Sequence, residues 1–330
     1  MTDSSATHPY DALTPDVVLD ALESLGLRAD GRLLALNSYE NRVYQVWLDD
    51  DAQTRVIVKF YRPGRWSDAA ILEEHEFASE LAALEIPVVA PLRFRDASLH
   101  LHANFRLAVF PRAAGRAPEF EQPETLEWMG RFLGRIHACG ATRSFKHRIT
   151  LNANTYGAQP LAFIHAGAFV PEALRPAYTA VTEQAMQGVH AAFTRAGAVK
   201  AIRVHGDCHA GNVLWNNGPT FVDLDDCCTG PAIQDLWMLL SGSRADQQTQ
   251  LLDVLAGYED FYEFDPRELH LIEALRTLRL IHMSGWIAKR WSDPAFPRAF
   301  PWFGSERYWQ DRILELREQI ALMSEPALVV

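Results

Sequence analysis

The stretch that decides the fold is residues 204–226, VHGDCHAGNVLWNNGPTFVDLDD. It places four aspartates beside two short apolar runs, 213–215 and 220–222. Isolated carboxylates next to buried strands are costly, because the charged form loses its hydration. A divalent cation with phosphate oxygens would offset that cost, so the stretch favours a metal–nucleotide site.

The spacing inside this stretch predicts that three polar side chains meet. Asp207 and Asn212 are five positions apart, in a loop whose two glycines permit tight turns. The two apolar runs can pair as a hairpin across 216–219, and this hairpin would return Asp223 beside Asn212. An aspartate that accepts a proton, an asparagine oxygen and a second aspartate form the phosphoryl-transfer arrangement of kinases. Mg²⁺ prefers such oxygen ligands, and an attacking hydroxyl needs a nearby proton acceptor.

The rest of the chain predicts a small β lobe followed by a larger helical lobe. Its 330 residues are enough for two lobes with a substantial core. Hydrophobic periodicity in the first part predicts, in chain order, a helix over 14–27, strands over 32–38, 41–50 and 54–62, a helix over 67–84, and strands over 86–94 and 104–111. After a linker near 111–118, the predicted helices are 124–138, 171–196, 234–241, 246–258, 266–290 and 306–323. We therefore expect an α+β bilobal chain, with an antiparallel-sheet lobe over 1–111, a mainly helical lobe over 112–330, and a ligand cleft between them.

Composition excludes several function classes. The chain is 48% hydrophobic and 22% charged, which is ordinary for a globular protein, and its formal charge of −11 argues against non-specific binding to nucleic acid or anionic lipid. We see no signal peptide in the polar arm expected over residues 1–12, and no apolar run reaches the length of a membrane span. The four cysteines are not spaced as a disulfide framework. We expect a cytoplasmic protein without nucleic-acid or membrane partners.

The β lobe offers a cation for nucleotide phosphates. Lys59 lies in VIVKFYR on the third predicted strand, where kinases place a phosphate-binding lysine that pairs with a glutamate of the next helix. Glu73, Glu74 and Glu76 are all available, and we prefer Glu74 for its distance from the following PVVAP segment. The alternatives are that the lysine protects an edge strand and that the glutamates only form a solvated helix face.

Several sequence blocks resemble a known family. HGDCHAGNVLW…FVDLDD is similar to the pattern HGDxxxxN…D of the aminoglycoside-phosphotransferase-like kinases. The chain resembles more closely the stress response kinase A family of bacterial cytoplasmic serine/threonine protein kinases, which have a protein-kinase-like fold. The blocks that carry this resemblance are LNSYENRVYQV, VKFYRPGRW, ILEEHEFA, VHGDCHAGNVLW, FVDLDD, GPAIQDLWMLL and RWSDPAFPRAFPW. They run from near the N-terminal helix to near the last helix.

The resemblance implies a role for each polar residue of the site. Asp207 matches the catalytic base, and Asn212 and Asp223 match the Mg²⁺ ligands. Asp223 also takes the place of the metal-binding aspartate of DFG, so it counts as catalytic as well.

On the nucleotide side, the resemblance implies that Ser38 lies at the ATP-proximal turn between the first two strands. Lys59 and Glu74 match the phosphate-binding lysine and its helix partner. Ser38 as an ordinary turn residue remains an alternative.

Three departures from ordinary protein kinases bear on regulation and on phosphate binding. HGD replaces HRD, and DLD replaces DFG with no APE segment after it, which puts regulation by activation-loop phosphorylation in doubt. The turn LNSYEN lacks the glycines of GxGxxG, so backbone amides and the Ser38 hydroxyl have to bind the phosphates.

The implied activity is transfer of the γ-phosphoryl group of ATP, with Mg²⁺, to Ser or Thr hydroxyls of proteins, including the chain itself, in a stress response. One rival is a small-molecule kinase that acts on an amino-alcohol, an aminoglycoside or a sugar, since acidic loops suit a cationic substrate. A rival of another class is an inactive kinase-like binding protein. The complete set Asp207, Asn212 and Asp223 argues against the last. Protein targets, regulation and oligomeric state stay open.

The polar residues beside these three have less specific interpretations. We expect His205 to be structural, because it would point the other way along its strand. Asp225 and Asp226 are either turn residues or anions near the metal. Asp235 begins a helix, either as a cap or as an anchor of the catalytic loop, and we expect the anchor.

Two further features stay open. Cys208, Cys227 and Cys228 with the neighbouring histidines suggest zinc, but no paired CxxC spacing supports it; buried thiols are the better prediction, and a redox role is not settled. The aromatic and Pro-rich segment 291–303 is either a wall facing the substrate or a packed tail.

Overall fold

A computed structural model of the chain describes residues 10–330. Of the polar arm predicted over 1–12, residues 1–9 lie outside this part. Tyr10 contradicts the prediction of a loose arm, because it is buried and stacks on Phe105. Its hydroxyl donates to the backbone carbonyl of Glu40 at 3.1 Å. An aromatic ring with a polar tip can bury its body where the hydroxyl finds a partner.

The smaller lobe is built on one antiparallel sheet, with strand order β1-β2-β3-β5-β4. Its elements are α1 (Pro15–Ser24), β1 (Ala29–Leu36), β2 (Arg42–Leu48), β3 (Arg55–Phe60), α2 (Asp68–Ala83), β4 (His100–His102) and β5 (Phe105–Pro111). The side chains of Thr14 and Ser67 accept hydrogen bonds from the first turns of α1 and α2, as capping residues do.

Strand β3 explains how a lysine comes to face the interior. It lies at the centre of the sheet, between β2 and β5. Val56, Val58 and Phe60 point to one face and pack with α1. Since side chains alternate along a strand, Lys59 points to the opposite face, toward α2 and the larger lobe.

The predicted strand over 86–94 is wrong. The edge of the sheet is instead β4, a short strand that pairs with β5. Pro87 and Pro91 have no N–H group, so this segment cannot form a full ladder. It stays extended and makes a bridge to the other lobe, where Val89 N donates to Phe221 O at 3.0 Å and Phe221 N donates to Pro87 O at 2.7 Å.

The larger lobe is mainly helical, as predicted. Its helices are α3 (Pro123–Gly140), α4 (Gln159–Ala166), α5 (Arg175–Ala196), α6 (Ile233–Leu236), α7 (Arg244–Tyr258), α8 (Ile272–Lys289), α9 (Ala295–Ala299) and α10 (Glu306–Leu322). Two small antiparallel pairs lie among them: β6 (Ile202–Val204) with β9 (Cys228–Gly230), and β7 (Val213–Trp215) with β8 (Pro219–Phe221). The hairpin predicted from the apolar runs is thus confirmed as β7–β8. The helices at 153–166 were not predicted.

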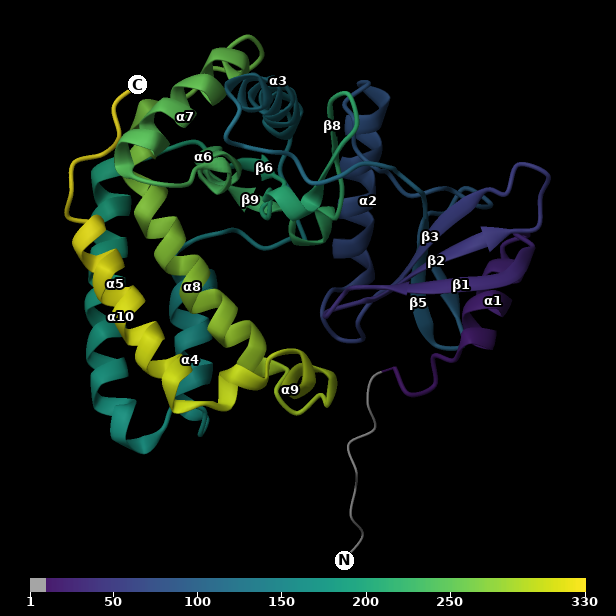
Figure 1. The fold of residues 1–330 in the computed structure, drawn as a ribbon, viewed down its shortest axis with the longest axis horizontal. Helices are drawn as coiled ribbons and strands as arrows, with labels where there is room; N and C mark the ends of the chain where they lie inside the picture. The colour runs from purple at the N-terminus through teal and green to yellow at the C-terminus, as the bar shows by residue number, and fades with distance from the viewer. Residues whose placement is uncertain (1–9) are drawn as a thin grey trace, which may run out of the picture.

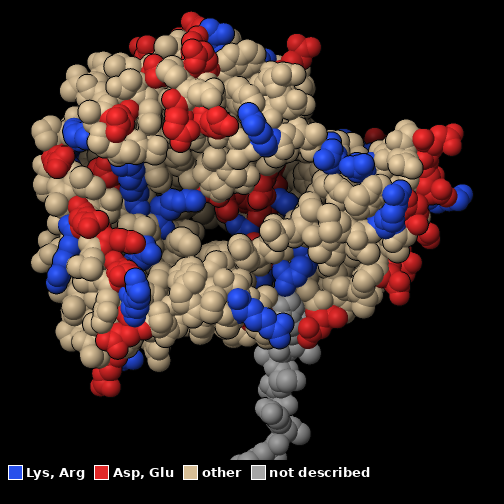
Figure 2. Space-filling view, viewed as in Figure 1, with Lys and Arg blue, Asp and Glu red and all other residues tan. Residues whose placement is uncertain are grey.

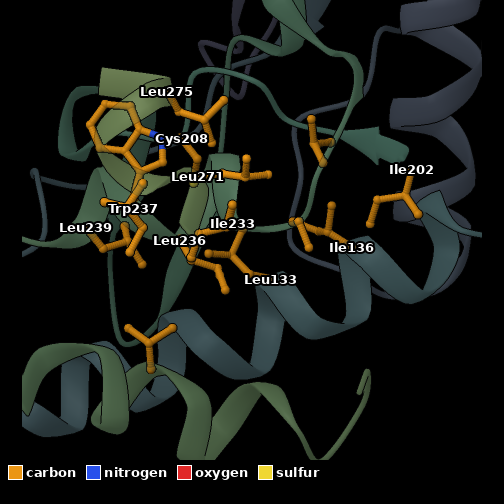
Figure 3. Packing of buried hydrophobic residues seen from close by; sticks show 14 of the residues in the cluster. Leu133, Ile136, Ile202, Cys208, Ile233, Leu236, Trp237, Leu239, Leu271 and Leu275 are labelled. Carbon is orange, nitrogen blue, oxygen red and sulfur yellow. The ribbon is translucent and has the colours of Figure 1, made fainter. Parts of the chain in front are cut away.

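The core of the larger lobe packs around these strands. Leu133 and Ile136 of α3 face Ile233 and Leu236 of α6, and Leu271 lies beside them (Figure 3). All five side chains are almost fully buried. This packing gives the short strands that carry the acidic loop a rigid base.

Helix α2 belongs to both lobes. Figure 1 shows it between the sheet on one side and the helices α3 to α10 on the other. Ile71, near its start, packs on the sheet with Tyr61, whereas Phe77 and Leu81 lie in the core of the larger lobe. The chain is therefore a bilobal α+β fold, and its division into separate domains at 111/112 stays a prediction.

Candidate functional site

The loop after β6 carries Asp207 and is fixed by a buried aspartate of α6. The carboxylate of Asp235 accepts the backbone N–H groups of His205 and Gly206, both at 2.8 Å. It also lies 3.0 Å from Nε2 of His137. The prediction that Asp235 anchors this loop is confirmed. The geometry of the loop that carries Asp207 thus depends on a helix that follows about thirty residues later in the chain.

The β7–β8 hairpin returns the chain to the same loop. Val222 N donates to Asn212 O at 3.0 Å, so Asp223 follows directly beside the asparagine. The side-chain amide of Asn212 donates to Asp207 O at 2.9 Å and lies 3.3 Å from Asp207 Oδ2. Nε2 of His205 bonds the carbonyl of Val222 at 3.0 Å, which supports its predicted structural role. The structure therefore brings Asp207, Asn212 and Asp223 together.

Asp223 is presented to the space between the lobes. Its backbone is left-handed, with φ 58° and ψ 60°, which is uncommon for a residue with a side chain. Its side chain is 52% exposed, whereas Leu224 and Asp225 after it are buried. A strained backbone that points one carboxylate into a cleft is typical of functional sites.

Lys59 meets Asp223 across the two lobes. Its Nζ lies 2.8 Å from Asp223 Oδ1, 3.7 Å from Asp225 Oδ1 and 4.0 Å from Glu74 Oε1. Burial opposes the charged form of this lysine, but the three carboxylates raise its pKa well above the usual value. The ammonium group is therefore a permanent cation in the site. The distance between Lys59 and Glu74 is at the upper limit for an ion pair, and the closest partner of the lysine is Asp223.

Glu74 is buried between two cations. Its other oxygen, Oε2, lies 3.7 Å from Nη1 of Arg148. Burial raises its pKa to about 7, against the lowering effect of Lys59. The neighbours Glu73 and Glu76 point elsewhere: Glu73 accepts backbone N–H groups of 146–148, and Glu76 pairs with Arg143. Of the three candidate glutamates, these contacts single out Glu74 as the one that faces the lysine.

Ser38 lies half-buried in the β1–β2 turn. The contacts of this turn toward the site come from its neighbours. Asn41 donates from Nδ2 to Asp225 Oδ2 at 3.2 Å, and Oε2 of Glu40 lies 2.7 Å from Nε of Arg290. An ATP role for Ser38 stays a prediction.

A buried arginine network holds the segment after Asp223. Arg65 pairs with both Asp225 and Asp226. Arg148 donates to the backbone carbonyls of Asp225 and Cys227. Although burial opposes ionisation, Arg65 and then Lys59 lower the pKa of Asp225, so its carboxylate stays charged. Asp225 thus supports the site through ion pairs. Arg65 and Arg148 were not predicted, although RPGR directly after the third strand contains the first of them.

Two basic side chains contact the carboxylate of Asp207. Nη1 of Arg279, on α8, donates to Oδ1 at 2.5 Å, and Nε2 of His209 lies 3.4 Å from Oδ2. Burial would raise the pKa of Asp207, but the contact with His209 and the charge of Arg279 lower it below the usual value. The carboxylate is therefore ionised at neutral pH, as a proton acceptor has to be.

The donor set suits a magnesium ion that arrives with phosphates. Asn212 uses its amide nitrogen on Asp207, which leaves its oxygen as a ligand, and Asp223 offers an exposed carboxylate. Within residues 10–330, no group of three or more His, Cys, Asp or Glu side chains is placed to hold a metal. Mg²⁺ in kinases is commonly bound by one or two carboxylates with substrate phosphates and water, and these residues fit that mode.

The site lies in a hollow between the lobes. Figure 2 shows acidic side chains at the depth of this hollow and basic side chains on the wall formed by the helical lobe. In the segment 291–303 the phenylalanine side chains are packed: Phe296, Phe300 and Phe303 are buried, whereas Trp302 is exposed. Of the two predictions for this segment, the packed tail agrees with these positions.

The cysteines near the site are free and buried. Cys208, Cys227 and Cys228 have no exposed surface. Burial raises the pKa of all three thiols, to about 12 for Cys227. Protonated thiols in an apolar environment are weak nucleophiles and weak metal ligands.

Comparison with known proteins agrees with this geometry. The phosphotransferase enzyme family matches residues 32–272. Stress response kinase A of Escherichia coli O157:H7 is 45% identical over 325 residues, which are 98% of this chain and 98% of that protein. A serine/threonine protein kinase, RdoA, of Salmonella typhimurium (strain LT2) is 43% identical over 328 residues, covering 99% of this chain and 98% of that protein.

Solved structures show the same fold at low identity. The amicoumacin kinase hAmiN, in complex with AMP-PNP, Ca²⁺ and Ami, has a TM-score of 0.72 at 19% identity and covers 94% of this chain and 93% of its own. A microcompartment-associated aminopropanol kinase has a TM-score of 0.66 at 18% identity, with coverage of 93% and 96%. Along residues 10–330, no helix combines the length and the apolar character that a bilayer crossing requires. By sequence and by fold, the chain is an ATP-dependent phosphotransferase that belongs to the phosphotransferase enzyme family and, within it, to the stress response kinase A family.

Proposed function

We propose that the chain is a serine/threonine protein kinase that transfers the γ-phosphoryl group of ATP to protein hydroxyls, its own included, as part of a stress response in the cytoplasm. The observation that carries the proposal is the contact of Lys59 with Asp223 at 2.8 Å, beside the loop that holds Asp207 and Asn212. Relatives at 43–45% identity over nearly their whole length, named stress response kinase A and serine/threonine protein kinase, support the acceptor class.

In this proposal, each residue of the site has a distinct task. The ionised carboxylate of Asp207 accepts the proton of the attacking hydroxyl. Lys59 interacts with the nucleotide phosphates, and Glu74 holds the lysine from the far side. The side chains of Asn212 and Asp223 would hold Mg²⁺, which would supply positive charge to the phosphates. Most of the rate enhancement then comes from positioning and charge neutralisation.

Arg65 and Arg148 position the metal-binding segment. Both contact the segment 225–227, directly after Asp223, and neither reaches the space between the lobes through an exposed side chain. Since these contacts are already present in the folded chain, we expect that the position of this segment does not require a phosphorylated loop.

A second candidate is a small-molecule kinase. Two solved structures with the same fold are named as kinases of amicoumacin and of aminopropanol. Because they are only 18–19% identical to this chain, their substrates are a weak guide to its own. The third alternative, an inactive binding protein, does not require an ionised Asp207 beside Asn212 and Asp223.

The test is transfer from labelled ATP with Mg²⁺ to a generic protein acceptor, followed by phosphoamino-acid analysis. We expect acid-stable label on Ser or Thr, and label on the chain itself when no acceptor is added. Label on amino-alcohols or sugars alone would favour the small-molecule candidate. Binding of ATP without any transfer would favour the inactive binding protein.

A further inference from the structure

Arg279 lies at the carboxylate that accepts the substrate proton. It belongs to α8, 72 positions after Asp207, and its Nη1 donates to Asp207 Oδ1 at 2.5 Å. Its side chain remains 41% exposed, so it lies at the open side of the site. A hydroxyl that reaches Asp207 therefore approaches a guanidinium group at the same time.

The bond to Asp207 uses one nitrogen of this guanidinium. The group has five N–H donors in a planar fork, and the Nε and Nη2 donors are not needed for the contact with Oδ1. Such a fork binds carboxylate or phosphate oxygens well and repels ammonium groups. An acceptor with an anionic group beside its hydroxyl would meet these donors.

Other basic side chains lie near Arg279 on and around α8, and most of them are neutral or paired with carboxylates. His282, almost one turn after Arg279, stacks on Tyr156 with ring centres 4.2 Å apart. The pKa of His282 is lowered to about 4, first by burial and then by the charges of Lys289, Arg290, Arg65 and Arg279. Arg65 and Arg290 are neutralised by Asp225, Asp226 and Glu40, whereas Lys289 is exposed.

We propose that Arg279 determines acceptor specificity, selecting Ser or Thr hydroxyls that have an acidic residue close by and disfavouring cationic acceptors. The inference rests on the proposed protein kinase activity and names its substrate class. Since consecutive Cα atoms are about 3.8 Å apart, the acidic residue would lie about one or two positions from the acceptor.

The experiment compares two serine peptides of equal length, one with Asp and Glu on both sides of the serine and one with Lys and Arg there. For the unmodified chain we expect kcat/KM to be about tenfold or more higher for the acidic peptide. Arg279→Gln should abolish the preference, Arg279→Lys should keep part of it, and Arg279→Glu should reverse it. The ratio of the two kcat/KM values separates specificity from a general loss of activity.

A matched control is Arg131→Gln on α3. Arg131 is 44% exposed and pairs with Glu127 at 2.6 Å, so it resembles Arg279 in exposure and pairing but lies outside the site. This variant should keep the peptide preference of the unmodified chain. The rise in melting temperature with ATP and Mg²⁺ shows that each variant is folded.

Two results would overturn the inference: equal kcat/KM for both peptides in the unmodified chain, or an unchanged preference in Arg279→Glu. The same assay includes glycerate and ethanolamine, an anionic and a cationic hydroxyl compound. Label on these small acceptors alone defeats the proposed protein kinase activity. In that case a preference for glycerate supports the role of Arg279, and a preference for ethanolamine defeats it.

Discussion

Lys59 and Asp223 come from different lobes and meet at 2.8 Å, while Asp207 lies in the loop that the hairpin brings beside Asp223. At the scale of the residue, the tasks of these groups differ. Asp207 is proposed to handle only the proton, whereas Asp223 is proposed to hold the metal and hence the nucleotide. Substitutions at the two positions should therefore have different effects on binding and on transfer.

Asp207→Ala should lower kcat by about 10²–10⁴-fold, the usual contribution of a general base, and leave nucleotide binding intact. Asp223→Ala should weaken both transfer and binding. The measurements are phosphoryl transfer from labelled ATP and the rise in melting temperature with ATP and Mg²⁺. Full activity in Asp207→Ala would contradict the base assignment.

The sequence allowed only part of the site to be predicted. Asp207, Asn212 and Asp223 lie within 17 consecutive residues, so turn and strand patterns were enough to bring them together. Arg65 and Arg279 reach the same place from 160 and 72 positions away, and no local pattern marks such contacts. Lys59 could be predicted because it lies on the third expected strand and a helix with glutamates follows it, and both features are local.

At the scale of the element, the loop between β6 and β7 depends on its first turn. Gly206 has φ +84°, and a Cβ atom there would lie 2.3 Å from the backbone carbonyl oxygen of Asp226. Two backbones approach closely here, and neither can move without shifting the site. The pattern HGD is thus required by packing as well as by chemistry.

Gly206→Ala should destabilise the chain by several kcal/mol, because the left-handed backbone and the close carbonyl both oppose a methyl group. Gly26 is the matched control, since its φ is +86° and no atom lies within 4 Å of the position that a methyl group would take. Gly26→Ala should cost only about 1–2 kcal/mol, the strain of the left-handed conformation. Urea unfolding measures both; equal losses would show that the close carbonyl has no effect.

Helix α6 carries the anchor Asp235, and a buried glutamate fixes its start. Oε2 of Glu268 accepts Ile233 N at 2.8 Å, and burial raises the pKa of Glu268 from 4.5 to about 7. The folded chain thus binds this proton more tightly than the unfolded chain. The stability from this group is present below pH 4.5 and is lost as the pH rises through about 7.

Glu268→Gln should remove that pH dependence. Between pH 5 and pH 8, the free energy of unfolding of the unmodified chain should fall by about 2–3 kcal/mol more than that of the variant. Urea unfolding of both proteins at the two pH values gives this change in the free energy of unfolding. The contributions of other titrating groups are the same in both proteins and cancel in the comparison. Parallel pH profiles would mean that Glu268 does not titrate in this range.

Secondary structure could be predicted where the periodicity was strong, and it failed where prolines interrupt a β-like pattern. Segment 86–94 is rich in apolar residues, but Pro87 and Pro91 leave it with too few N–H groups for a sheet strand. The short strand β4 has only three residues, too few for an alternating pattern to be visible.

At the scale of the whole molecule, ion pairs connect the lobes beside the site. Arg62 and Arg65 of the smaller lobe reach Asp293 and Asp226 of the larger one, at 2.7 and 2.5 Å. Glu40 in the β1–β2 turn accepts Trp286 Nε1 at 2.5 Å. In each of these pairs at least one side chain is no more than 10% exposed. Such pairs set a relative orientation of the lobes more than they add stability, because desolvation offsets their attraction.

Arg65→Met should destabilise the chain by about 3–5 kcal/mol, since it leaves the buried carboxylate of Asp225 without its main partner. Arg28→Met is the control: Arg28 is 79% exposed and pairs with Asp49 at the surface. That variant should lose about 1 kcal/mol at most. Urea unfolding compares the two, and similar small losses would show that the network contributes little.

The buried thiols of Cys208, Cys227 and Cys228 also have a consequence for how the chain meets oxidants and alkylating reagents. Peroxide or iodoacetamide reaches these sulfur atoms only after the larger lobe opens locally, because none of them has exposed surface in the folded chain. The rate at which these thiols are labelled would therefore report how often the lobe that carries Asp207 opens locally.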